Sequence, residues 1–131
     1  MQSIRVTLPL SVTIGRSRVS MSRNRWENLH FRQKTKVKEI IRELVYKQVI
    51  LYAALGESVS VSSVLYVDRL NCDLGNFNDV LLKICSDCLV KAGIIKDDNV
   101  KIIKTETRIF GGVDKLNPRL EVTYTTTTGG E

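Results

Sequence analysis

The sequence predicts an α+β fold: a single domain in which two main helices pack against a mixed four-stranded sheet. Three observations support this prediction. Some segments alternate polar and apolar residues, as strands do, and two longer segments carry apolar residues at helical spacing. Their order along the chain is β-α-β-α-β-β. The length of 131 residues suits one compact domain with its own core, so we treat residues 1–131 as one unit.

The strands are predicted from alternation and from β-branched residues. In the first strand Ile4, Val6 and Leu8 share one face, and Pro9 ends the strand or confines it to a sheet edge. The segment 110–118, "FGGVDKLNP", is expected to be the turn between the last two strands. The four predicted strands span residues 3–10, 58–67, 99–109 and 119–127.

Two segments are predicted to be helices because their apolar residues recur every three or four positions. The first spans residues 35–55 and is expected to stop at Gly56. The second spans residues 77–92 and is expected to stop at Gly93. Its polar face carries an Asp–Lys–Asp row at positions 79, 83 and 87, where ordinary helix ion pairs are the simplest interpretation.

The segment 11–34 shows no sustained period and is rich in Arg, Ser and Asn, so we interpret it as a long basic loop. Trp26, His30 and Phe31 lie among its arginines. Cations interleaved with flat rings suit phosphate contact and base stacking. The alternative is a solvated loop whose aromatic residues pack into the core. The predicted DNA contacts are Arg16, Arg18, Arg23, Arg25, Arg32, Lys34, Lys36 and Arg69.

The composition favours an acidic binding partner and a cytoplasmic location. The formal net charge is +6 and the pI is about 9.4, which favours an acidic partner. No apolar run is long enough to span a membrane, and the N-terminus alternates instead of forming a signal peptide, so a cytoplasmic protein is expected. The residues 125–131 are expected to form a flexible tail.

Two of the three cysteines, Cys85 and Cys88, are predicted to be buried core thiols. The odd number of cysteines, Cys72, Cys85 and Cys88, argues against a disulfide framework. Cys85 and Cys88 form a C-x-x-C inside a helical pattern, with no second pair to complete a zinc site.

Acidic residues gather on both sides of the second predicted helix. Asp68 and Asp73 follow one strand, and Asp97 and Asp98 precede the next. If these strands are neighbours, we expect both groups to meet at the same end of the sheet. Clustered carboxylates raise each other's pKa, and a Mg²⁺ ion removes that cost. Such a site beside a basic surface suits phosphodiester cleavage, provided that Asp73 and Asp98 share the ion; helix capping is the alternative.

Two stretches of this region resemble RusA-type Holliday junction resolvases. "YVDRLNCDLGN", residues 66–76, is similar to the D-R-x-x-x-D-L-D-N segment of that family. Lys83, Asp87, Leu89, "KAG" and the Asp97–Asp98 pair are similar to its following helix and acidic turn. The first and last strands also fit the ends of the family, so the resemblance covers most of the chain. The basic segment is similar, more loosely, to that of some phage members.

The resemblance implies a small, homodimeric endonuclease that uses Mg²⁺, or Mn²⁺ in its place, to nick four-way DNA junctions symmetrically. It implies a role in recombination, repair or phage DNA processing, in a bacterial host and encoded by a phage or prophage. Lys83 would supply positive charge near the scissile phosphate, and Asn76 fits the family Asn. The implied catalytic residues are Asp73, Asp79, Lys83 and Asp98, and the implied metal ligands are Asp73, Asp79, Asp97 and Asp98.

This sequence departs from the family pattern in two ways. Gly75 replaces the second Asp of D-L-D-N, and the segment between Asn76 and Lys83 is about four residues longer. Either Asp79, one helical turn before Lys83, compensates for the missing ligand, or the protein binds branched DNA with little catalytic activity. A third possibility is a phage assembly or regulatory protein whose basic segment meets an acidic partner.

Overall fold

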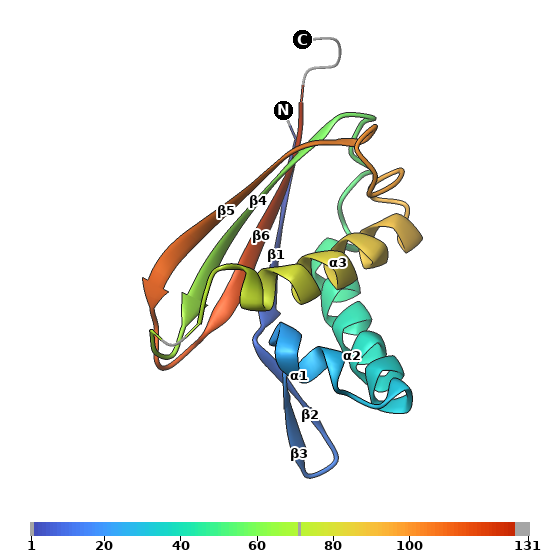
Figure 1. Cartoon of the computed structure of the whole chain (residues 1–131). Helices are drawn as coiled ribbons and strands as arrows, with labels where there is room; N and C mark the ends of the chain where they lie inside the picture. The colour runs from blue at the N-terminus through green and yellow to red at the C-terminus, as the bar shows by residue number, and fades with distance from the viewer. Residues whose placement is uncertain (1, 71, 128–131) are drawn as a thin grey trace.

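The computed structural model describes residues 2–70 and 72–127. They form a four-stranded sheet, a separate two-stranded hairpin and helices on one side of the larger sheet (Figure 1). The predicted α+β architecture with a mixed four-stranded sheet is therefore confirmed. The elements are β1 (Ser3–Pro9), β2 (Ser11–Ile14), β3 (Ser17–Ser20), α1 (Arg23–Glu27), α2 (Phe31–Val49), β4 (Val59–Val67), α3 (Gly75–Lys91), β5 (Ile103–Val113) and β6 (Arg119–Thr126).

The large sheet has the strand order β1-β6-β4-β5. β6 pairs antiparallel with both β1 and β4, whereas β5 pairs parallel with β4. Pro9 lies at the end of the edge strand β1, as expected, because an edge position tolerates a missing N–H. β5 forms the other edge and is mostly exposed, so its polar side chains are available to a site.

The helix α3 is the most deeply packed helix of the fold. It contacts α1, α2 and β6, and most of its side chains are buried. Each fully buried Leu or Val contributes about 1.5–3 kcal/mol, so this packing holds the helix firmly. The polar stripe of α3 with Asp79, Lys83 and Asp87 stays in contact with solvent, and so does Lys91 in the last turn.

The prediction of buried thiols in α3 is confirmed. Cys85 and Cys88 are both free and buried. Burial raises the pKa of Cys85 to about 12, because the thiolate cannot be solvated there. This thiol is therefore part of the core and not a redox site.

The prediction of a long loop over 11–34 is wrong. These residues form the β2–β3 hairpin, the short helix α1 and the first turn of α2. Gly15, with φ +60°, makes the tight hairpin turn, and Val12 and Val19 pack into the core. Strands of four residues are too short to establish a period, which is why the sequence pattern misses them.

Element boundaries also differ from the predictions. α2 begins at Phe31 and ends at Val49, short of residue 55. Leu55 is still buried, but it lies in an irregular connection and its N–H donates to the Ile94 carbonyl at 2.8 Å. β5 continues to Val113, so the "FGGV" assigned to a turn belongs to a strand. The expected tail starts later, because Thr125 and Thr126 lie in β6; residues 128–131 fall outside the described part.

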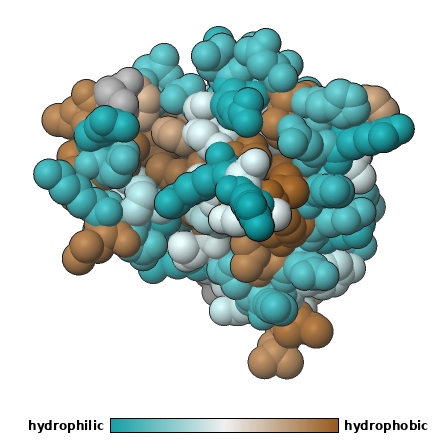
Figure 2. Space-filling model, turned by 90° about the horizontal axis from the view of Figure 1, so that it is seen from below, coloured by the Kyte–Doolittle hydropathy of each residue, from teal (hydrophilic) through white to brown (hydrophobic). Residues whose placement is uncertain are grey.

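Hydrophobic side chains remain exposed near the end of β4 and β5. Leu70 and Phe110 are 75% and 48% exposed, and Leu116 is 98% exposed. Figure 2 views the molecule from below and shows hydrophobic residues on that face among more numerous hydrophilic ones.

Within the described residues, the structure holds no helix with the length and hydropathy needed to cross a membrane.

Candidate functional site

A shallow pocket of about 230 Å³ lies between α3, β5 and the connection that precedes β5. We call it the acidic pocket, because three carboxylates line it. Leu82, Ser86 and Ile103 supply the rest of its wall. Its charged residues are Asp79 and Lys83 from α3, Asp98 from the connection, and Glu106 and Arg108 from β5.

The local folding explains why these groups meet. Positions 106 and 108 are two apart on a strand, so both side chains leave β5 on the same face. β4 and β5 are parallel, and α3 is the crossover that connects them. The polar stripe of α3 therefore faces the charged residues of β5.

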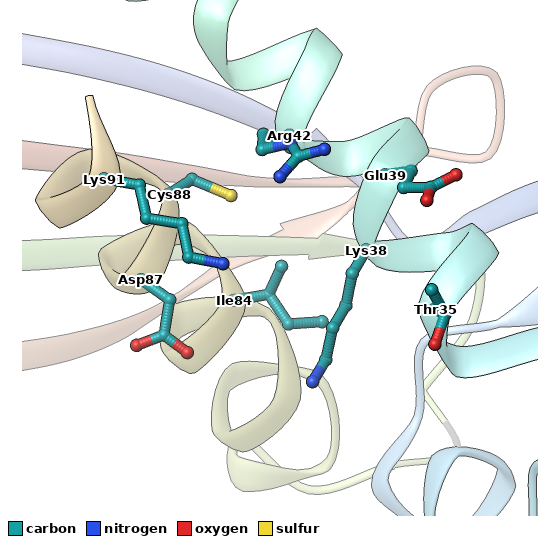
Figure 3. A pocket seen from close by; sticks show the side chains of 8 residues that line it. All are labelled: Thr35, Lys38, Glu39, Arg42, Ile84, Asp87, Cys88 and Lys91. Atoms are coloured by element: carbon teal, nitrogen blue, oxygen red, sulfur yellow. The ribbon is translucent and has the colours of Figure 1, made fainter. Parts of the chain in front are cut away.

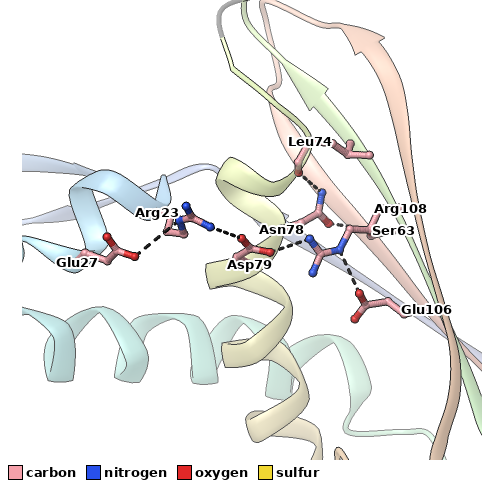
Figure 4. Close-up of polar contacts among 8 residues, drawn as sticks. All are labelled: Arg23, Glu27, Ser63, Leu74, Asn78, Asp79, Glu106 and Arg108. Carbon is pink, nitrogen blue, oxygen red and sulfur yellow. Dashed lines mark hydrogen bonds and ion pairs between the residues drawn. The ribbon is translucent and has the colours of Figure 1, made fainter. Parts of the chain in front are cut away.

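Asp79 is held by two arginines from different parts of the chain (Figure 4). Arg108 donates to one carboxylate oxygen at 2.7 Å, and Arg23 of α1 donates to the other at 3.0 Å. Arg108 also donates to Glu106 at 3.1 Å. The hydrogen bond from Arg108 is the main cause that lowers the pKa of Asp79, and Arg23 adds to it. Asp79 is thus ionised at neutral pH.

Lys83 bridges two carboxylates. Its ammonium donates to Asp98 at 2.7 Å and lies 3.3 Å from Asp87. The hydrogen bond lowers the pKa of Asp98 and raises the pKa of Lys83. Asp97 has a different role, because its oxygens accept hydrogen bonds from the Asp98 N–H and the Asn99 side chain. Asp97 therefore shapes the turn that presents Asp98.

A buried polar pair fixes the start of α3. Ser63 of β4 donates to the Asn78 side-chain oxygen at 2.7 Å, and the Asn78 amide donates to the Leu74 carbonyl at 2.7 Å (Figure 4). Both side chains are buried, so losing either bond leaves an unsatisfied group. This anchor sets the position of Asp79, the next residue.

The expected meeting of Asp73 and Asp98 is wrong. The parallel register pairs Val59 with Ile103 and Val67 with Val113. Asp73 follows the last residue of β4, whereas Asp98 precedes the first residue of β5, at the opposite end of the strand pair. From the start of α3 to Lys83, the partner of Asp98, the helix rises roughly 12 Å. The nuclease hypothesis fails in the form that needs these two residues on one ion.

Asp73 instead lines a mostly apolar hollow with Leu65, Leu70, Leu74 and Phe110. Asp68 lies near Arg69, with 4.0 Å between the charged atoms. The structure therefore separates this pair of acids from the acidic pocket. It brings together three of the predicted catalytic residues, Asp79, Lys83 and Asp98.

The donor set of the acidic pocket limits which metal it can hold. Among residues 2–70 and 72–127, no group of three or more His, Cys, Asp or Glu side chains is arranged to bind a metal ion. Asp79 and Asp98 line one pocket as two carboxylates. Mg²⁺ in nucleic-acid enzymes uses one or two carboxylates and completes its shell with waters and substrate phosphate, so Asp79 and Asp98 are the residues of this pocket that would hold it.

The basic residues predicted to contact DNA lie in several places. The hairpin projects from the lower end of the molecule, away from the large sheet (Figure 1). Arg23 alone among the predicted contacts bonds to a residue of the acidic pocket within the described structure. The set comprises Arg16 and Arg18 on the hairpin, Arg23 and Arg25 on α1, Arg32, Lys34 and Lys36 at the start of α2, and Arg69 after β4.

The aromatic residues of this region divide between the two predicted roles. Trp26 packs against the core, and the Lys34 ammonium lies over its ring, 5.5 Å from the ring centroid, in a cation–π contact. Phe31 is 68% exposed and stacks on His30 with 4.6 Å between ring centroids. Phe31 is therefore the ring that is free to meet a ligand.

Sequence reasoning missed Glu106 and Arg108. Their signal is the alternation of charge in Lys104, Glu106 and Arg108, which places charged side chains on one face of a strand. That signal becomes informative only with the knowledge that β5 pairs parallel with β4.

Comparison with protein-family models finds no match to the chain, and comparison with curated proteins finds none either.

Proposed function

We propose that the protein is a Mg²⁺-dependent endonuclease for branched DNA, of the RusA type that the sequence resembles. The observation that carries this proposal is the pocket in which Asp79 and Asp98 flank Lys83 and Arg108. Acidic ligands for a cation and basic groups for a phosphate stand side by side there. Asp73 and Asp97 have no direct part in the proposed site, because one lies elsewhere and the other shapes a turn.

Each residue has a defined role in this proposal. Asp79 and Asp98 would hold Mg²⁺, which supplies an activated water and neutralises developing charge on phosphorus. Arg108 and Arg23 orient Asp79 and keep it ionised. Lys83 offers an ammonium to a phosphate oxygen of the DNA, in exchange for part of its contact with Asp98. Two symmetric cuts require two such sites about a two-fold axis, so the proposal includes a homodimer.

A second candidate function is binding of branched DNA without cleavage. The specific observation that favours it is that Asp79, Asp98 and Glu106 are each already paired with a cation in the acidic pocket. Gly75 also removes the carboxylate that the family places there. A site whose acids are neutralised in this way attracts a metal ion less strongly.

The deciding experiment measures cleavage of a synthetic four-way junction with Mg²⁺, with Mn²⁺ and with EDTA, alongside sedimentation to count subunits. Asp79→Asn and Asp98→Asn are expected to lose at least about 100-fold in cleavage rate, because each removes a metal ligand. Asp73→Asn is the matched control and keeps the parental rate. If the parent binds junctions tightly but cuts with neither metal, the second function is correct. Equal rates for Asp79→Asn and the parent contradict the proposed site.

A further inference from the structure

A second pocket, of about 220 Å³, lies between α2 and α3. We call it the cationic pocket, because Lys38, Arg42 and Lys91 line it. Its floor is formed by Ile84 and Cys88, both buried. Figure 3 shows Arg42 and Lys91 extending from facing helices into the space above this floor. The remaining lining residues are Thr35, Glu39 and Asp87.

Among the described residues, no carboxylate lies within ion-pair distance of the three cations of this pocket. Ion pairs with N···O distances up to 4.0 Å among residues 2–70 and 72–127 include none with Lys38, Arg42 or Lys91. Asp87 is paired with Lys83 at 3.3 Å, and Figure 3 shows the Glu39 carboxylate pointing away from the cavity. Like charges gathered in one small pocket repel each other, and a bound anion relieves that repulsion.

The surroundings of Cys88 agree with this geometry. Burial raises the pKa of the Cys88 thiol, the charges of Arg42 and Lys91 lower it, and the Asp87 carboxylate raises it. Two cations from different helices therefore approach the same buried sulfur. Their apolar floor excludes water on one side, which strengthens attraction for an anion.

A third hollow joins the cationic pocket to the acidic pocket. It shares Lys38 and Asp87 with the cationic pocket, and Asp79 and Lys83 with the acidic pocket. The three hollows thus follow one another along the exposed stripe of α3. From Lys83 to Lys91 the helix rises roughly 12 Å, which along the axis of duplex DNA spans about three to four base pairs at 3.4 Å each.

We propose that the cationic pocket binds the phosphodiester backbone of the nucleic-acid strand that enters the acidic pocket. Lys38, Arg42 and Lys91 contact phosphates about three to four nucleotides from the one at Lys83. The inference rests on the proposed function in that the ligand is nucleic acid, but it does not require cleavage. Three adjoining hollows along one helix suit a polymer backbone better than a free phosphate ion.

The test measures the dissociation constant of a fluorescent four-way junction between 50 and 200 mM KCl, in EDTA so that no strand is cut. A lost phosphate contact lowers the slope of log affinity against log salt by about 0.7–0.9. Arg42→Gln and Lys91→Gln are each expected to lower it by that amount, and the double variant by about twice as much. Lys47→Gln, an exposed cation on α2 outside the pocket, is the matched control. Parental slopes for both pocket variants overturn the inference.

Two further arms separate this inference from the proposed function and from a free anion. If the pocket variants lose slope although the parent never cuts DNA, the backbone site is supported and the nuclease proposal fails. If the parent cuts DNA but the pocket variants keep the parental slope, the nuclease proposal is supported and the backbone site is overturned. Inorganic pyrophosphate is titrated while the Arg42 side-chain N–H is followed by NMR. Binding of pyrophosphate as tight as that of the junction overturns the assignment to a polymer backbone.

Discussion

Gly75 is the first residue of α3 and stands where the resembled family has an aspartate. A Cβ atom at this position would lie 3.4 Å from an Asp79 carboxylate oxygen and 3.8 Å from an Arg108 nitrogen. These are ordinary contact distances, so a Cβ atom fits at this position. Position 75 therefore faces the acidic pocket although its own residue supplies no ligand.

Replacing this glycine tests whether the pocket is short of one carboxylate. Gly75→Asp is expected to lower the Mg²⁺ concentration for half-maximal junction cleavage by about tenfold, because it adds an oxygen ligand beside Asp79. An acid in the first turn of a helix is also electrostatically favourable. Metal titrations of the cleavage rate measure the change. Gly75→Asn, which has the same size without the charge, is the control, and an equal shift in both variants contradicts the prediction.

At the scale of elements, β4 and β5 show most clearly what the sequence predicts. The alternation in β4 and the helical stripe of α3 are long, so both were identified close to their observed bounds. The sequences of β4 and β5 do not reveal whether the two strands run parallel or antiparallel, because side chains alternate in the same way in both arrangements. The resemblance named Asp79, Lys83 and Asp98, which line one pocket, whereas the expected meeting of Asp98 with Asp73 failed because it depends on strand direction.

The strand β5 also contains an irregularity that only glycine allows. Leu65 pairs with Phe110 and Tyr66 with Gly112, so Gly111 is the extra residue of a bulge. A Cβ atom at Gly111 would lie 2.7 Å from both Val64 Cγ1 and Tyr66 Cε1. These distances are too short for any side chain unless the Val64 and Tyr66 side chains move.

Gly111→Ala is therefore expected to destabilise the fold by about 1–3 kcal/mol, the usual cost of inserting a methyl group into a filled space. Urea unfolding followed by circular dichroism measures the free energy. Thr107→Ala on the same strand, at an exposed position, is the control and should change it by less than about 0.5 kcal/mol. A Gly111→Ala protein as stable as the parent would show that the bulge relaxes freely.

At the scale of the whole molecule, ion pairs tie separate segments together. Arg23 joins α1 to α3, Lys83 joins α3 to the connection before β5, and Arg108 joins β5 to α3. The acids in these pairs have lowered pKa values, and Lys83 has a raised one. Folding stability must therefore depend on pH through these groups.

The direction of that dependence can be stated. The pKa of Asp98 is lowered from 3.8, so its stabilising effect is complete above pH 3.8 and is lost as the pH falls through the lowered value. The pKa of Lys83 is raised from 10.5, so its effect is complete below pH 10.5 and is lost as the pH rises further. Lys83→Gln is expected to be less stable than the parent near pH 7, with a difference that shrinks below pH 3.8. Urea unfolding from pH 2.5 to pH 8 measures it.

Lys47→Gln, whose lysine has no ion pair among residues 2–70 and 72–127, serves as the control for this series. The free energy of unfolding of Lys47→Gln should equal that of the parent at every pH. A Lys83→Gln difference that stays constant across the acid range would mean that its pair with Asp98 does not control stability.

Ser3 faces Thr125 across β1 and β6, and the Gln2 carbonyl accepts a hydrogen bond from the Thr126 N–H at 2.9 Å. The two ends of the described chain thus lie side by side (Figure 1). A short glycine–serine linker could join them, and new termini could be opened in the exposed turn at 115–117 without cutting any strand. Such a circular permutant would keep the whole sheet while changing which segment leaves the ribosome first.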